Sequence, residues 1–377
     1  MRIGILTLPL HTNYGGILQA YALQTVLKRM GHEVVVIDTY KKLHLPIWKW
    51  PLSIPKRLIA KYLLGKGNTI LAEYKYNKTL SIINQHTQHF IQRNISRKII
   101  KDISEINPFD FDTIVVGSDQ VWRPCYFKNM FHTTINHSFL AFAKEWKLKR
   151  IAYAASFGTE EWEFTEEETE ECKNLAALFD AISVREDSGV QLCQSKLNVE
   201  ATHVLDPTML LESREYVNLT KKANTPHIEG NLLYYILDET LEKKRIIENI
   251  SKLKSLIPFT VNANVYKNNN DINRRIQPPI EKWLRGFLDA EFIITDSFHA
   301  CVFSIIFKKP FIAIGNKERG MSRFKSLLKM FELEERLISE YDDISLPNDD
   351  INWEKVEKIL SLKKKLSFNF LKQHSNN

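Results

Sequence analysis

His299 is the residue of this sequence that is best placed to do chemistry. It follows a short apolar run at 292–295 that predicts a buried strand, and it opens an apolar segment, 298–307, without Gly or Pro. That segment predicts a buried crossover helix with Asp296 or Ser297 as its N-cap. His299 would then lie in the first helical turn, where free N–H groups and the helix dipole favour an anion. A histidine there adds an exchangeable proton, which suits an enzyme acting on a phosphorylated acid, although it could equally cap its neighbours.

Arg185 follows another predicted strand, residues 181–184. The carboxyl ends of parallel strands meet at one edge of a sheet, and ligands of α/β folds bind in the crevice outside that edge. A planar guanidinium there matches a carboxylate or a phosphate, so Arg185 is a candidate for catalysis and for donor binding. The alternative is a structural ion pair with Glu186 or Asp187.

Asp119 comes after a third predicted strand, residues 111–117, together with Ser118 and Trp122. An aspartate accepts hydrogen bonds from sugar hydroxyls and an indole ring covers an apolar sugar face, so these residues predict a site for a sugar acceptor. The alternative is a tight turn with a packed tryptophan.

The first predicted strand, residues 2–7, runs into a glycine turn that opens an amphipathic helix extending to about Met30. Paired glycines at such a turn let a ligand come close to the backbone, although the spacing is not the G-x-G-x-x-G of a dinucleotide site. Residues at this turn and at the start of the helix extend the predicted acceptor site. The alternative is that they only form the turn. They are Asn13, Tyr14, Gly15, Gly16 and Gln19.

The second half of the chain also alternates predicted strands and helices, as expected for a parallel sheet. Its strands are expected at 232–237, 292–295 and 310–314. After the last of these, Arg319 and Arg323 stand in a basic loop and helix start that could hold further phosphate charge.

Composition narrows the class of protein. With 377 residues, 44% of them hydrophobic, the chain is long enough for two domains that each bury a core. The formal net charge of +7 favours small phosphorylated substrates or an anionic membrane surface as partners, and no nucleic acid is expected. The four cysteines lack C-x-x-C spacing and nearby histidines, so no metal site or disulfide framework is expected, which fits a reduced cytoplasm. We find no signal peptide and no apolar stretch of roughly 18 residues that could span a membrane.

Residues 41–66 differ from the rest of the chain. They hold seven Lys and Arg and no acidic residue, interleaved with Trp, Tyr, Ile and Leu. This combination is typical of an interfacial segment that settles among anionic headgroups, so we expect a peripheral position at the inner face of the cell membrane. The alternative is a solvated loop and helix whose aromatic residues pack on the domain.

Six motifs, in their order and spacing, resemble the polysaccharide pyruvyl transferase family: NYGGILQAYALQ, VVGSDQVW, YAASFG, SVRE, VLDPTMLL and TDSFHA. The resemblance implies two Rossmann-like, doubly wound α/β domains in a GT-B-like arrangement, with the active site in the interdomain cleft. We expect an N-terminal domain at 1–206 on the acceptor side and a C-terminal domain at 207–345 on the donor side. A terminal helix and tail at 346–377 can pack back on the N-terminal domain.

The resemblance also implies an activity. Members of this family move pyruvate from phosphoenolpyruvate onto two hydroxyls of a sugar, in a cell-surface polysaccharide or its lipid-linked precursor, and form a cyclic ketal. Phosphoenolpyruvate is then a co-substrate, and no metal or other cofactor is expected. By this resemblance His299 is the catalytic histidine beside the donor, Arg185 holds phosphoenolpyruvate and Asp119 lies near the acceptor, and all three are candidate catalytic residues.

The sequence departs from the family pattern at one donor-site position. The family often carries a basic residue where Ser297 stands, so part of the donor's charge must be met by another group, such as Arg319 or Arg323. Ser297 itself stays a candidate for donor binding, through its place at the start of the predicted helix.

Two other classes of function stay open. A GT-B-type glycosyltransferase with a nucleotide-sugar donor would have the same two-domain cleft and would also bind phosphate at a helix N-terminus. A non-catalytic scaffold of a polysaccharide assembly is the other class. The presence of His299 and Arg185 at separate strand ends argues against a scaffold.

Overall fold

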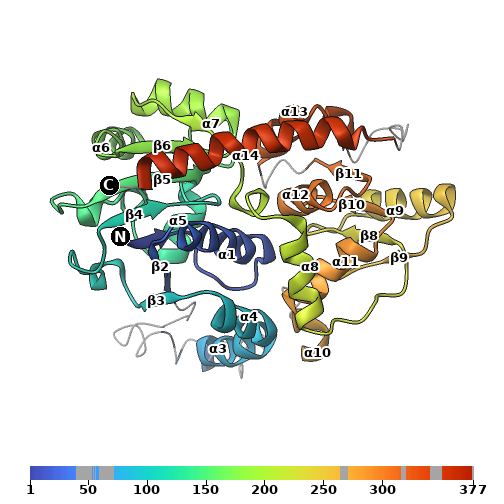
Figure 1. The fold of residues 1–377 in the computed structure, drawn as a ribbon. Helices are drawn as coiled ribbons and strands as arrows, with labels where there is room; N and C mark the ends of the chain where they lie inside the picture. Colours follow the sequence, from blue (N-terminus) through green and yellow to red (C-terminus); the bar gives the residue numbers. More distant parts are fainter. Residues whose placement is uncertain are drawn as a thin grey trace.

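The computed structural model describes residues 1–39, 53, 55, 57–58, 72–263, 271–315, 320–339 and 350–375. These residues form two parallel β-sheets with helices packed around them (Figure 1). The seven-stranded sheet has the order β3-β2-β1-β4-β5-β6-β7, and the five-stranded sheet has the order β12-β11-β10-β8-β9. The arrangement confirms the predicted fold class, two Rossmann-like α/β domains in a GT-B-like arrangement.

The elements of the first sheet alternate along the chain as a doubly wound fold requires. Its strands are β1 (Arg2–Leu6), β2 (Glu33–Thr39), β3 (Arg97–Ile100), β4 (Thr113–Val116), β5 (Lys149–Ala155), β6 (Ala181–Val184) and β7 (Thr202–His203). Its helices are α1 (Tyr14–Arg29), α3 (Ala72–Ile83), α4 (Gln85–Asn94), α5 (Pro124–Phe131), α6 (Glu166–Ala176) and α7 (Asp187–Leu192).

The second sheet follows the 3-10 turn η6 (Pro207–Met209). Its strands are β8 (Leu232–Tyr235), β9 (Pro258–Phe259), β10 (Phe292–Thr295), β11 (Phe311–Ile314) and β12 (Leu337–Ile338). Its helices are α8 (Ser213–Lys222), α9 (Leu241–Lys254), α10 (Ile272–Arg275), α11 (Ile280–Asp289), α12 (Phe298–Ile306), α13 (Met321–Phe331) and α14 (Trp353–Ser375).

The central strands are buried on both faces, which explains their continuous apolar sequences. Every residue of β4, β10 and β11 is buried, as expected when helices cover both faces of a parallel sheet. Helix α12 connects the parallel strands β10 and β11, and all of its residues are buried. The predicted crossover helix is therefore confirmed, with Ser297 as its N-cap.

Residues 72–94 form two helices, α3 and α4, that meet at Asn84. The basic, aromatic segment 41–66 lies outside the described residues, apart from 53, 55, 57 and 58. Its predicted membrane role is therefore still a prediction.

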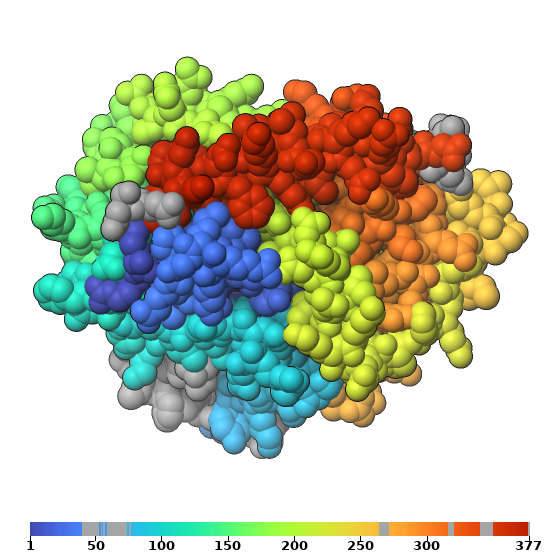
Figure 2. Space-filling model, in the orientation of Figure 1, coloured from blue at the N-terminus to red at the C-terminus, as the bar shows by residue number. Residues whose placement is uncertain are grey.

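Helix α14 crosses one face of the molecule (Figure 2) and packs against both domains. Near its start, Val356 is buried and Lys355 forms an ion pair with Glu332, the residue that ends α13. Near its end, Ser367 Oγ accepts a hydrogen bond of 3.0 Å from the Leu205 N–H. One buried apolar cluster includes residues of both sheets and of α14, so the two domains pack without a separating layer of solvent.

Candidate functional site

A cavity of about 260 Å³ lies between the two domains. Its walls are built largely from the segments that follow β1, β4, β8 and β10, together with parts of α5, α11 and α13. Strand ends from both sheets therefore meet at one place, as expected for ligand sites in α/β folds.

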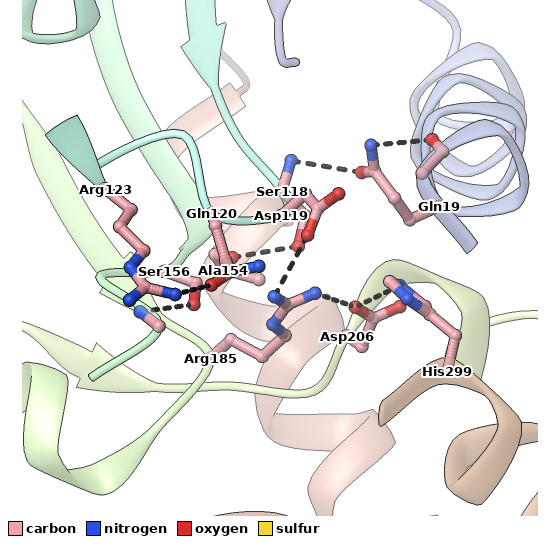
Figure 3. Close-up of polar contacts among 12 residues, drawn as sticks. Gln19, Ser118, Asp119, Gln120, Arg123, Ala154, Ser156, Arg185, Asp206 and His299 are labelled. Atoms are coloured by element: carbon pink, nitrogen blue, oxygen red, sulfur yellow. Dashed lines mark hydrogen bonds and ion pairs between the residues drawn. The ribbon is translucent and has the colours of Figure 1, made fainter. Parts of the chain in front are cut away.

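His299 lies in this cavity, in the first turn of α12, with 6% of its surface exposed. Its Nε2 is 3.6 Å from Oδ2 of Asp206 (Figure 3). That separation is too long for a hydrogen bond, so Nε2 has no hydrogen-bond partner among the described residues. The imidazole is therefore able to bond to a bound ligand.

Asp206 is buried and is the N-cap of η6, shortly after β7. Its Oδ1 accepts hydrogen bonds from the N–H of Thr208 at 3.0 Å and from the hydroxyl of Thr208 at 2.7 Å. Burial alone would raise the pKa of Asp206, but His299 and Arg185 together lower that pKa well below its usual range. Asp206 is therefore a fixed negative charge behind the imidazole.

Arg185 lies behind Asp206 and does not line the cavity. Its Nη1 donates to Asp206 Oδ2 at 2.8 Å, its Nη2 donates to Asp119 Oδ1 at 3.3 Å, and its side chain is 1% exposed. Burial would lower the pKa of Arg185, but the two carboxylates raise it, so it stays charged. Its partners are distant in sequence, and the alternative pairing with Glu186 or Asp187 is not the one observed. Direct binding of a donor by Arg185 stays a prediction and would require one of these ion pairs to open.

Asp119 lines the cavity from the first sheet, 3% exposed. Its backbone has φ 70°, in the left-handed region that aspartate tolerates better than most residues. Its Oδ2 lies 3.5 Å from the Nδ2 of Asn13, which also lines the cavity. Burial would raise the pKa of Asp119, but Arg185, His299 and Arg323 lower it, so this carboxylate is ionised.

Gly15, the second residue of α1, leaves the space that the imidazole occupies. A Cβ built on Gly15 would lie 2.1 Å from Nδ1 of His299, a distance that no side chain can accept. At Gly16 a Cβ would lie 3.1 Å from the flexible amide of Asn13 and 3.4 Å from Oδ2 of Asp119. Of the two glycines, Gly15 is therefore the one that lets α1 and α12 pack closely against each other.

Arg323, in α13, is the predicted phosphate-binding arginine that lines the cavity. Burial, together with the charge of Arg185, lowers the pKa of Arg323 to about 10. Both guanidinium groups lie against the ring of Phe298, at 5.4 Å for Arg323 and 4.5 Å for Arg185. Ser297 also lines the cavity, whereas Arg319 lies outside the described residues.

Three residues predicted to bind the acceptor are part of the scaffold instead. The prediction for Trp122 is wrong, because its ring is 0% exposed and stacks on Phe139 at 4.7 Å within the core. Ser118 is buried, and its hydroxyl donates to the Ala154 carbonyl at 2.9 Å. Gln19 is buried as well, and its Oε1 accepts the Ser118 N–H at 3.2 Å. Ser118 and Gln19 therefore connect the end of β4 with β5 and α1, and they do not face a ligand.

Tyr14 lines the cavity but its polar atom is already used. Its hydroxyl donates to the Pro278 carbonyl at 2.7 Å, and its ring stacks on Trp283 at 5.5 Å. Tyr14 thus joins the two domains and offers a ligand its ring.

Asp206 is the site residue that sequence reasoning missed. It belongs to the motif VLDPTMLL, and its place in that motif, next to Pro207, was the available signal.

The described residues contain no cluster of His, Cys, Asp and Glu that could hold a metal ion. Among the same residues, no helix is both long enough and apolar enough to cross a membrane.

Several solved structures resemble this chain at low sequence identity. The UDP-GlcNAc 2-epimerase of Methanocaldococcus jannaschii shares 13% identity, with a TM-score of 0.47 and coverage of 96% of this chain and 92% of that one. The UDP-GlcNAc 2-epimerase of Neisseria meningitidis bound to UDP-GlcNAc shares 11%, with a TM-score of 0.45 and coverage of 97% and 94%. An Arabidopsis thaliana protein in complex with UDP-L-rhamnose shares 9%, with a TM-score of 0.47 and coverage of 98% and 93%.

The chain matches no curated protein. A family model described as polysaccharide pyruvyl transferase matches residues 13–318, a span that includes every residue of the His299, Asp206, Arg185 and Asp119 network. The chain therefore belongs to the polysaccharide pyruvyl transferase family.

Proposed function

We propose that this protein transfers pyruvate from phosphoenolpyruvate to two hydroxyls of a sugar in a cell-surface polysaccharide or its lipid-linked precursor. The observation that carries the proposal is His299, which lies in an interdomain cavity with a free Nε2, a carboxylate behind it and Arg323 in the same cavity. Family membership supports the transferase class, and this geometry supports the donor.

The donor end of the cavity is assigned to the start of α12. Phosphoenolpyruvate carries a carboxylate and a phosphate, and free N–H groups of a helix N-terminus with a nearby guanidinium favour both. We assign Arg323 as the first contact of the donor, because it lines the cavity and Arg185 does not. Arg185 acts on the donor through Asp206 and Asp119, whose charges it holds in place.

The reaction is the addition of two hydroxyls to one carbon. A proton joins C3 of the enol, which becomes a methyl group, and C2 becomes electrophilic. Both acceptor hydroxyls bond to C2, and the bond from C2 to the phosphate oxygen breaks. One of the two hydroxyl protons balances the proton gained by C3, and the other leaves with inorganic phosphate.

His299 is the residue we assign to proton transfer in this reaction. An imidazolium can deliver its proton to C3 or to the departing phosphate, and the Asp206 carboxylate stabilises that charged form. Asp119 faces the same cavity and is ionised, so it can accept a hydrogen bond from a reacting hydroxyl. Arg323 and the helix N-terminus stabilise the charge that develops on the leaving phosphate.

The proposal is tested by a donor comparison on the full-length protein. Phosphoenolpyruvate and nucleotide sugars are each offered with methyl hexosides, methyl N-acetylhexosaminides and lipid-linked oligosaccharides, and products are identified by mass spectrometry. We expect a pyruvate ketal and released phosphate with phosphoenolpyruvate alone. Glycosyl transfer from a nucleotide sugar, with phosphoenolpyruvate inert, would contradict the proposal and support the glycosyltransferase alternative.

We also infer that residues 41–66 hold the enzyme at an anionic membrane surface, where a lipid-linked acceptor would be found. Seven basic residues among aromatics support this inference. Each basic residue near the surface contributes about 1 kcal/mol and salt weakens the attraction, so binding to vesicles with phosphatidylserine should fall as salt rises. Equal binding to purely phosphatidylcholine vesicles would contradict it.

A further inference from the structure

The cavity lining combines ionisable and neutral side chains. The ionisable ones include His299, Asp119, Arg323, Asp296 and His11. A neutral region of the lining comes from Tyr235, Ile236, Leu237, Gln277 and Trp283, whose side chains are amide, aromatic or aliphatic. A neutral wall of this kind suits the hydroxyls and apolar faces of a sugar better than it suits a phosphate.

Gln277 is a polar residue of this neutral region, and it has an unused acceptor atom. It is 7% exposed and lines the cavity. Its Nε2 donates to the Thr12 carbonyl at 2.7 Å, and its backbone N–H donates to the Ile83 carbonyl at 2.8 Å. Its Oε1 has no donor among the described residues, and a buried acceptor left without a partner is costly.

The Nε2 bond decides which way the amide faces. Because Nε2 is held by the Thr12 carbonyl, the amide cannot rotate to exchange its oxygen and nitrogen without placing two oxygens together. Oε1 is therefore fixed as the free atom, and it requires a donor such as a hydroxyl group from a ligand.

Aromatic rings lie next to this amide in the same wall. Tyr14 stacks on Trp283 at 5.5 Å, and Trp283 meets Tyr235 edge to face at 5.6 Å. Tyr14 and Tyr235 line the cavity with 2% and 7% of their surface exposed, whereas Trp283 is 0% exposed and supports their rings from the core. Aromatic rings beside a fixed amide form a surface that recognises a pyranose.

We propose that this neutral region of the cavity is the acceptor subsite, with Gln277 Oε1 accepting a hydrogen bond from a sugar hydroxyl that does not react. Tyr14 and Tyr235 form its aromatic wall. The inference rests on the proposed function, since it names where the acceptor of that reaction binds. It draws acceptor specificity from both domains, because Gln277 and Tyr235 belong to the second domain and Tyr14 to the first.

Three substitutions separate the roles of the two amide atoms. Gln277→Leu removes both atoms, Gln277→Lys keeps a donor for the Thr12 carbonyl without an acceptor, and Gln277→Glu keeps an acceptor without that donor. KM for phosphoenolpyruvate and for the best methyl glycoside is measured for each variant. We expect the acceptor KM to rise about 10-fold in the Leu and Lys variants and to change much less in Gln277→Glu, with donor KM unchanged.

A monodeoxy series of the same glycoside identifies the hydroxyl. In the natural protein one deoxy derivative should raise the acceptor KM about 10-fold, and in Gln277→Leu that derivative should behave like the parent sugar. An unchanged acceptor KM in the Leu variant, or a pattern in which Lys restores binding and Glu does not, would overturn the subsite, because the tether to Thr12 would then explain the effect. Absence of any pyruvyl transfer by the natural protein would overturn the proposed function itself and the subsite with it.

Discussion

Charges of opposite sign alternate behind His299, and this order explains why the residues can be buried together. Asp206 lies between His299 and Arg185, and Arg185 lies between Asp206 and Asp119. A buried charge without a partner would cost several kcal/mol, whereas each charge in this network is paired with at least one opposite charge. The network therefore holds the imidazole at the cavity wall without leaving an isolated charge.

His299 is the residue on which the proposed reaction depends most. His299→Ala should lose about 100-fold or more in kcat, the usual scale for a lost general acid or base, with little change in unfolding temperature. His299→Gln keeps a hydrogen-bond donor but delivers no proton, so it should be nearly as inactive. Steady-state kinetics with phosphoenolpyruvate and thermal unfolding provide the two measurements. If the Gln variant recovers most of the activity, His299 only binds phosphate and another group transfers the proton.

Glu186 lies close to this network, and the effect of its burial can be tested through the pH dependence of stability. It is fully buried, and its Oε1 accepts the N–H groups of Phe157 at 2.7 Å and Gly158 at 3.2 Å. Burial raises the pKa of Glu186 above its ordinary value of 4.5, despite the opposing charge of Arg185. A raised folded-state pKa means that stability is fully present below the unfolded value and is lost as pH rises through the folded value.

Glu186→Gln removes this titration and keeps an oxygen for the two N–H groups. The unfolding temperature of the variant, relative to the natural protein, should therefore rise as the pH increases above 4.5. Glu167→Gln, on an exposed position of α6, is the control and should change the unfolding temperature only slightly. A difference for Glu186→Gln that is flat, or that falls with pH, would contradict the assignment.

At the scale of elements, the sequence predicted the strands better than the contacts between their ends. Strand β6 and helix α12 were expected almost as they are, because apolar runs buried on both faces leave few alternatives. Trp122 was misjudged because a ring beside a strand end looks the same in sequence whether it faces a ligand or the core. The pairing of Arg185 with Asp119 and Asp206 spans 66 and 21 residues, and no local pattern carries that information.

The approach of α1 to α12 gives a prediction about a single methyl group. Gly15→Ala would place a Cβ 2.1 Å from Nδ1 of His299, so the imidazole or the helix must move. A displacement of about 1 Å at a catalytic group can cost on the order of 100-fold in rate, and that is the expected loss in kcat. Gly16→Ala is the matched control, because its Cβ would lie 3.1 Å from the flexible Asn13 amide and 3.4 Å from Oδ2 of Asp119, without a clash as close as at Gly15, and should preserve most of the activity. Equal losses in both variants would show that the turn as a whole, rather than the space for His299, sets the rate.

At the scale of the whole molecule, the site requires the two domains to keep their relative positions. The cavity takes its walls from both sheets, and His299 of the second domain lies against Gly15 and Asp206, which follow strands of the first. Cross-domain hydrogen bonds such as that from Tyr14 to Pro278 contribute locally. Helix α14 is the element that contacts both domains along its length.

The packing of α14 gives the last prediction. Phe370 is 7% exposed and its ring lies 6.2 Å from that of Tyr153 in β5, so this end of the helix is anchored in the core of the first domain. Phe370→Ala removes a buried ring and should destabilise the fold by about 3–5 kcal/mol, whereas Leu362→Ala, on the same helix but 59% exposed, should cost no more than about 0.5 kcal/mol. Because the anchor joins the domains, the Phe370 variant should also unfold in two steps in calorimetry, with pyruvyl transfer lost at the first. A single transition at reduced temperature, with activity retained up to it, would mean that α14 stabilises one domain and leaves the cavity to be held by the remaining contacts.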